Sequence, residues 1–165
     1  MGCYGADISR LNKGFKMGLD MYLSASKYHG GSLNEELTDL TKAVNQVTDT
    51  KGYQVKNIDI WACDWRKANQ IHAWFVDNVQ GGEDDCDRYH VSMEDLRLLV
   101  KLCKDVLADH SKAEEYLPTQ AGFFFGGTEI DDYYFDELKE TIEKLKPFVT
   151  DPSWESWDFY YQSSW

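Results

Sequence analysis

The densest group of side chains that could take part in chemistry lies in the segment Asp64–His72. The guanidinium of Arg66 could hold a carboxylate or a phosphate through two parallel hydrogen bonds. If a helix begins at Trp65, Asn69 lies one turn from both Arg66 and His72. The backbone amides of the first turn would point toward the same bound anion. The segment therefore suggests a binding site for a small anionic ligand.

Tyr161 and Gln162, near the C-terminus, belong to the same hypothesis, because a cleft joining them to Arg66, Asn69 and His72 would complete the site. The competing interpretation is structural. Arg66 would then pair with one of many acids, and Asn69 and His72 would satisfy nearby backbone groups. A general base also needs a second group that orients it, and none can be identified for His72. The residue types favour the structural interpretation.

A second group consists of acids on a helix expected over residues 131–148. Thr128 or Asp131 is expected to cap this helix, and Asp131 and Asp132 lie at its start, where negative charge is favourable for the helix dipole. With Asp136 and Glu140 they give one helix a strongly negative surface. This surface is a candidate for binding a basic partner or for imitating phosphates, although such acids are also ordinary on an exposed helix.

Other patterns argue against a metal, a cofactor or catalysis. The four cysteines form no C-x-x-C pair, the four histidines form no H-x-x-x-H spacing, and the acidic loop 83–87 lacks the ligand spacing of an EF-hand. Phosphate-loop and nucleophile-elbow motifs are missing. We expect no metal, no cofactor and no catalytic residue. Cys86, in the polar loop, is predicted to be a free thiol, and reduced thiols favour a cytoplasmic location.

Composition limits the partners. The chain has 165 residues, which suits one domain, and a net charge of -12. Such a charge disfavours direct binding to nucleic acid or to an anionic membrane. It favours a basic protein partner, including one that itself normally binds nucleic acid. No apolar run approaches the ~20 residues that a membrane span requires.

Hydrophobic periodicity predicts an α+β fold: a small antiparallel or mixed sheet with three to four helices packed on one face. Residues 1–16 are expected to form an irregular arm and residues 17–165 a single domain, with Met17 as a candidate start. Strands are expected over 17–23, 53–61 and 157–163, and a buried strand or packed loop over 123–125. Helices are expected over 33–47, 65–79, 92–107 and 131–148.

Four stretches resemble a family of uncharacterised bacteriophage and prophage proteins. They are MGLDMYL from Met17, WRKANQIHAWF from Trp65, GFFFG from Gly122 and DFYYQSSW from Asp158. The resemblance covers most of residues 17–165 and implies no established activity, so no functional residue is carried over. It implies a viral accessory protein that interacts with a host.

Three functions follow as hypotheses. The first is a non-enzymatic phage accessory protein that binds and inhibits a host or defence protein in the host cytoplasm, including anti-CRISPR or DNA-mimic action. The second is a protein that binds or hydrolyses a nucleotide or another small anion. The third is a structural homo-oligomer, such as a homodimer whose seam contains the aromatic C-terminal segment.

Overall fold

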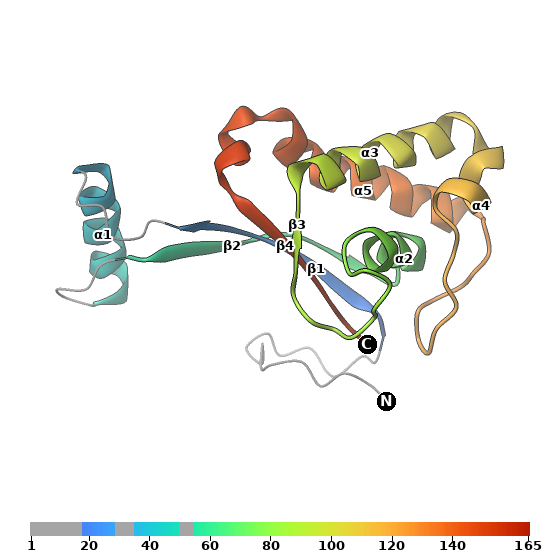
Figure 1. Ribbon diagram of the computed structural model, residues 1–165, viewed down its shortest axis with the longest axis horizontal. Coiled ribbons are helices and arrows are strands. Elements are labelled where there is room, and N and C mark those ends of the chain that lie inside the picture. Colours follow the sequence, from blue (N-terminus) through green and yellow to red (C-terminus); the bar gives the residue numbers. More distant parts are fainter. Residues whose placement is uncertain (1–17, 29–34, 50–54) are drawn as a thin grey trace.

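The computed structural model describes residues 18–28, 35–49 and 55–165, and its centre is an antiparallel sheet of four strands (Figure 1). In spatial order the strands are β2 (Asn57–Arg66), β1 (Asp20–Tyr28), β4 (Asp158–Ser164) and β3 (Tyr89–Val91). β4 pairs with β1 on one side and with β3 on the other. The C-terminal segment therefore returns to the sheet as predicted. The expected arm 1–16 and the expected start of the helix at 33 lie outside the described residues.

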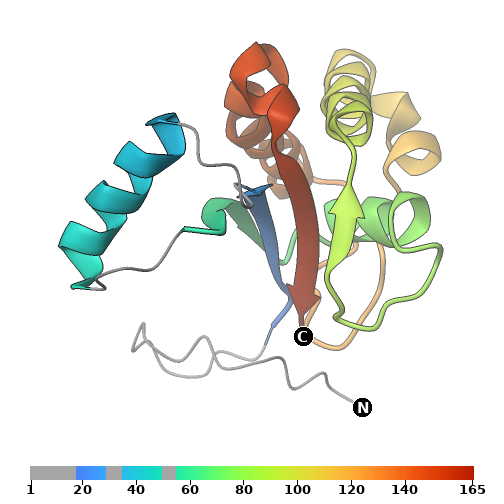
Figure 2. The same cartoon turned by 60° about the vertical axis from the view of Figure 1, so that its left-hand side comes forward.

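One face of the sheet forms the core. Side chains alternate along each strand, and the inward set is almost fully buried; it includes Met21, Leu23, Ala25, Phe159 and Tyr161. Helices α2 (Asn69–Asn78), α3 (Met93–Ala108) and α5 (Asp132–Thr150) supply the other side of the core. Figures 1 and 2 show α3 and α5 lying side by side over the sheet. The expected α+β fold with an antiparallel sheet and helices on one face is confirmed.

The helix ends follow local chemistry. At the start of α3, the Ser92 hydroxyl accepts a hydrogen bond from the Asp95 amide at 3.0 Å, and the Asp95 carboxylate accepts one from the Ser92 amide at 3.1 Å. The remaining helices are α1 (Glu35–Thr48), which lies beyond the ends of β1 and β2 in both views, and the short α4 (Ala113–Tyr116). Two 3-10 turns, His110–Lys112 and Pro152–Ser156, complete the described chain.

The structure corrects several boundaries. β1 runs from Asp20 to Tyr28 rather than ending at 23. β2 continues to Arg66, so the helix expected from Trp65 begins only at Asn69. A bulge at Ala62 keeps Trp65 on the inner face, where its indole donates to the Thr141 hydroxyl at 3.0 Å. Residues 123–125 form no strand; they lie in the loop between α4 and α5. The short strand β3 was not expected at all.

Candidate functional site

The turn from β2 to α2 separates Arg66 from the other residues of the expected ligand site. Arg66 points to the face opposite Trp65 and forms an ion pair with Asp20, its direct partner on β1. Lys67 then reverses the chain with a φ of 62°, and its amide donates to the Leu19 carbonyl at 2.9 Å. Arg66 therefore lies on the exposed face of the sheet, while the helix that follows enters the interior.

Asn69 holds the connecting loop, which we define as residues 117–131 between α4 and α5. Its side chain is buried, and its amide donates to the Gly127 carbonyl at 2.7 Å and to the Phe125 carbonyl at 3.4 Å. Its carbonyl oxygen accepts from the Gln120 amide at 3.0 Å. Because one buried side chain contacts three points of the loop, Asn69 determines the path of the loop.

His72 joins three parts of the chain in a buried hydrogen-bond network. Nδ1 lies 2.8 Å from the Tyr161 hydroxyl, and Nε2 lies 3.1 Å from a carboxylate oxygen of Asp84. The other oxygen of Asp84 accepts from the Trp165 indole at 3.0 Å. His72 and Tyr161 are both 0% exposed, so a substrate has no access to either. The arrangement ties the loop after α2 to β4.

Burial and hydrogen bonding set the charge states in this network. Burial opposes ionisation of Asp84, but the hydrogen bond and the electrostatic attraction of His72, together with the Trp165 hydrogen bond, hold its pKa below the ordinary value. Burial raises the pKa of Tyr161 well above its ordinary value, and the nearby charge of Asp84 adds to this effect. At neutral pH Asp84 is therefore a carboxylate and Tyr161 keeps its proton.

Of the five residues expected to bind a ligand, the structure places three in the interior and two elsewhere. Asn69, His72 and Tyr161 are buried with their polar atoms engaged by other protein groups. Gln162 follows Tyr161 on the strand, faces the other side, and donates to the Cys86 carbonyl at 3.0 Å. With Arg66 paired to Asp20, the geometry does not favour an open site for an anion.

The cysteines differ from the expectation at one position. Cys86 is buried and disulfide-bonded, so the prediction of a free thiol there is wrong. Cys63 and Cys103 are free and buried, and burial raises the pKa of each thiol to about 12. Such thiols remain protonated and are poor nucleophiles.

The four acids expected to bind a partner lie along α5, and three of them have partners within the chain. Asp131 caps the helix by accepting from the amides of Tyr133 and Tyr134 at 3.0 and 3.2 Å. Asp136 pairs with Lys139 at 2.8 Å, and Glu140 with Lys144 at 2.7 Å. Asp132 is exposed at the first turn. This part of α5 therefore presents mixed charge rather than a continuous row of acids.

The cap role of Asp131 can be tested directly. We expect Asp131→Ala to lower the free energy of unfolding by about 1 kcal/mol, because two amides lose their acceptor. Asp131→Asn removes the same charge but keeps an oxygen that can cap, so we expect its stability to match that of the parent. Urea unfolding measures both. Equal losses in the two variants would show that charge, not capping, is what Asp131 contributes.

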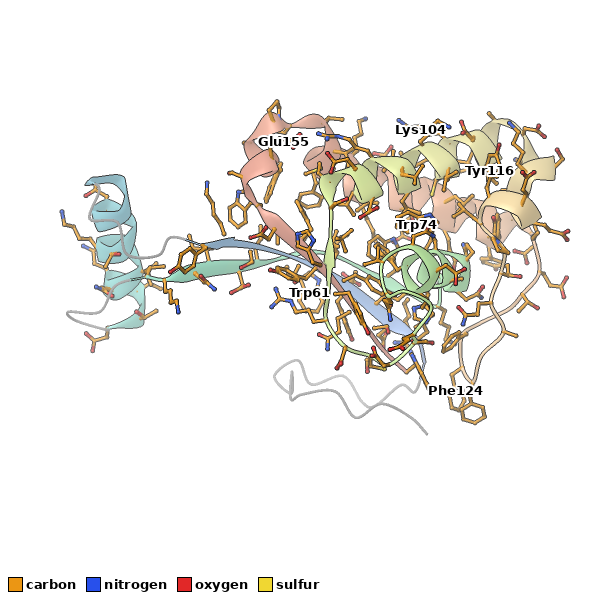
Figure 3. The ribbon with its side chains drawn as sticks, viewed as in Figure 1. Trp61, Trp74, Lys104, Tyr116, Phe124 and Glu155 are labelled. Atoms are coloured by element: carbon orange, nitrogen blue, oxygen red, sulfur yellow. The ribbon has the colours of Figure 1, made fainter. Side chains whose placement is uncertain are left out.

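The connecting loop exposes two aromatic side chains that the sequence did not lead us to expect at the surface. Phe123 is 79% exposed and Phe124 is 40% exposed, and their ring centres lie 4.1 Å apart. Phe125 alone is buried, against His72. Figure 3 shows Phe124 at the tip of the loop, away from the helices. The glycines that flank the three phenylalanines were the available signal for a loop.

These rings belong to what we call the acidic segment, residues 113–138. It contains no lysine, arginine or histidine, and its seven acids are Glu114, Glu115, Glu129, Asp131, Asp132, Asp136 and Glu137. Tyr133, at the start of α5, is 80% exposed. The segment thus combines exposed aromatic rings with acidic side chains and no basic residue of its own, a combination that expectations based on single motifs overlooked.

Among the described residues, no group of three or more His, Cys, Asp or Glu side chains is arranged to hold a metal ion. None of the described helices is long and apolar enough to cross a membrane. Comparisons with family models, with curated proteins and with solved structures give no match to this chain.

Proposed function

We propose that this protein is a non-enzymatic binding protein that docks on a basic partner protein through its acidic segment, with Phe123 and Phe124 as apolar anchors. The observation that carries the proposal is the exposed pair of phenylalanine rings within a stretch that has seven acids and no basic residue. Large aromatic side chains at the centre of an interface supply much of its binding energy. Acids elsewhere in the same segment would favour a positively charged partner.

The backbone supports this use of the loop. Phe124 has a φ of 67°, a conformation that a phenylalanine rarely adopts and that surrounding contacts must maintain. The Phe124 carbonyl accepts from the Leu19 amide at 3.4 Å, and Asn69 holds the residues on either side. A loop fixed in this way presents its rings with little loss of conformational freedom on binding.

The partner we propose is a host protein, bound and inhibited by a viral accessory protein; the disulfide at Cys86 removes the argument from reduced thiols for a cytoplasmic location. The ion pairs of Asp136 and Glu140 with Lys139 and Lys144 favour recognition of a protein surface over imitation of a DNA backbone. The anionic-ligand alternative has less support, because Asn69, His72 and Tyr161 are buried and engaged. The homodimer alternative also has less support, because the rings of Phe159 and Tyr161 in the C-terminal segment already lie in the core of the same chain.

The test is affinity capture from a bacterial lysate with the full chain and with the double variant Phe123→Ser/Phe124→Ser. We expect the parent to capture a basic protein at low salt and to release it as salt rises, because the contact is partly electrostatic. The double variant should capture at least about tenfold less, as expected when interface anchors are removed.

A matched control is Val47→Ser, since Val47 is 88% exposed on α1, away from the acidic segment. This control should capture as much as the parent. If the double variant and the control capture the same protein equally, the acidic segment is not the interface and the proposal is wrong.

A further inference from the structure

A groove opens between α2, α3 and α4, outside the sheet and its core. Its volume is about 480 Å³, and residues of all three helices line it, among them Trp74, Leu98, Leu102 and Tyr116. The volume falls within the roughly 300–1,000 Å³ of binding pockets for small groups. Figure 3 labels Trp74 on α2 and Tyr116 on α4, on two of the elements that border it.

Trp74 belongs to the hydrophobic core, and Leu102 and Tyr116 pack against it, so Leu98 is the large apolar lining residue that the core leaves exposed. The buried stripe of α3 contains Leu96, Leu99 and Cys103, whereas Leu98 and Leu102 lie on another side of this helix. They are four residues apart and so lie one above the other along the helix. Leu98 is 43% exposed. Two stacked leucines beside Trp74 and Tyr116 make an apolar strip that can accept side chains spaced one helical turn apart.

The charges beside this strip are acidic. Asp77 and Glu115 are the ionisable residues that line the groove, and both are exposed. Two basic side chains are relevant to this charge: Lys101 pairs with Asp105 at 2.6 Å, and Lys112 lies 5.7 Å from the centre of the ring of Tyr116, a lining residue. The groove thus combines an apolar floor with negative walls, which complements an apolar surface flanked by lysine or arginine.

We propose that this groove binds a basic amphipathic helix of the partner protein, with apolar side chains at i and i+4 resting on Leu98 and Leu102. Helices commonly bind in this way, by laying an apolar face in a groove between helices. The inference rests on the proposed function and names a second contact for the same basic partner. Glu115 belongs to both surfaces, since it lies in the acidic segment.

The probe is a labelled synthetic peptide of about 15 residues, near the length at which an isolated helix becomes stable. Leucines occupy one face at i, i+4 spacing and lysines the other. A second peptide has the same composition with the leucines distributed around the helix, and a third has glutamine in place of lysine. We expect the full chain to bind the first peptide saturably, and the other two at least about tenfold more weakly.

The variant is Leu98→Lys and its matched control is Val47→Lys. Both replace an exposed apolar side chain and add one positive charge, and Val47 lies on α1, which does not line the groove. We expect Leu98→Lys to weaken binding of the first peptide about tenfold or more, and Val47→Lys to leave it within about twofold. Thermal unfolding of both variants confirms that they remain folded. The indole N–H resonance of Trp74 should shift on binding.

Equal binding of the first two peptides, or equal effects of the two variants, would overturn the inference, because the binding would then be general attraction to a chain of net charge -12. Tight binding of the third peptide, which has glutamine in place of lysine, would contradict the claim that the partner is basic and would indicate an apolar partner instead. The proposed function is tested separately. If Phe123→Ser/Phe124→Ser loses the captured protein while Leu98→Lys binds both it and the peptide normally, only the groove inference fails.

Discussion

Replacing Tyr161 with alanine is expected to lower the free energy of unfolding by about 4 kcal/mol, because removing a large buried aromatic ring leaves a cavity that the surroundings fill only in part. Tyr161 is fully buried in a central strand, and its ring stacks on Phe75 with centres 3.9 Å apart and an angle of 10° between the planes. Its hydroxyl also contacts His72. Urea unfolding followed by circular dichroism measures the change.

Two further substitutions help to interpret this effect: one isolates the contribution of the hydroxyl, and the other is a control on the other face of the strand. Tyr161→Phe keeps the ring and removes only the hydroxyl; we expect a loss of about 1–3 kcal/mol, since the buried Nδ1 of His72 loses its partner. Tyr160→Ala removes a ring of similar size from the other face of the same strand. Tyr160 is half-buried and lies 4.0 Å from the Arg88 guanidinium, so we expect a loss of about 1 kcal/mol. Equal losses at positions 160 and 161 would contradict the burial argument.

The elements predicted well are those whose signals are local. The N-terminus of α3 needs only Ser92 and Asp95, which satisfy each other's backbone amides. The start of α5 needs only Asp131. β4 was also found correctly, because alternation of Phe159 and Tyr161 with more polar neighbours fits a strand with one buried face. In each case the residues that decide the structure are close together in the chain.

The wrong predictions of secondary structure and burial fall where residues far apart in the chain determine the local structure. A helix was expected from Trp65, yet β2 continues to Arg66 because Asp64, Trp65 and Arg66 pair with Tyr22, Met21 and Asp20 of β1. The three consecutive phenylalanines looked buried as a group. Of the three, only Phe125 enters the core, where the buried side chain of Asn69 holds its carbonyl and the amide of Gln120. The hydrophobic pattern within each segment gives no indication of these long-range contacts.

The contrast between local signals and contacts of distant residues also applies to the candidate site. The sequence singled out Asn69, His72 and Tyr161 as candidate ligand-binding residues, and the structure brings His72 and Tyr161 into direct contact. The structural interpretation anticipated that these polar groups are satisfied within the chain, but it could not name their partners, since Gln120 and Gly127 lie more than 50 residues from Asn69. What the residue types suggested as ligand binding is, in the fold, the support of a surface loop.

Asn69→Ala tests that support and connects it to function. We expect the free energy of unfolding to fall by about 3 kcal/mol, because a buried side chain with three hydrogen bonds is removed and its partners remain in the interior. The amide of Gln120 loses its acceptor. We therefore expect hydrogen exchange at Gln120 to accelerate about tenfold or more, with little change in the sheet. Exchange followed by mass spectrometry measures both regions.

Asn78→Ala is the matched control, because Asn78 lies on the same helix but is exposed and bonds only to the Trp74 carbonyl one turn earlier. Its removal should cost less than about 1 kcal/mol and leave the loop unchanged. If Asn69 holds the loop for binding, Asn69→Ala must also weaken capture of the basic partner, although Phe123 and Phe124 are intact. Normal exchange and normal capture in Asn69→Ala would show that the loop keeps its shape without Asn69, and that this residue contributes only to stability.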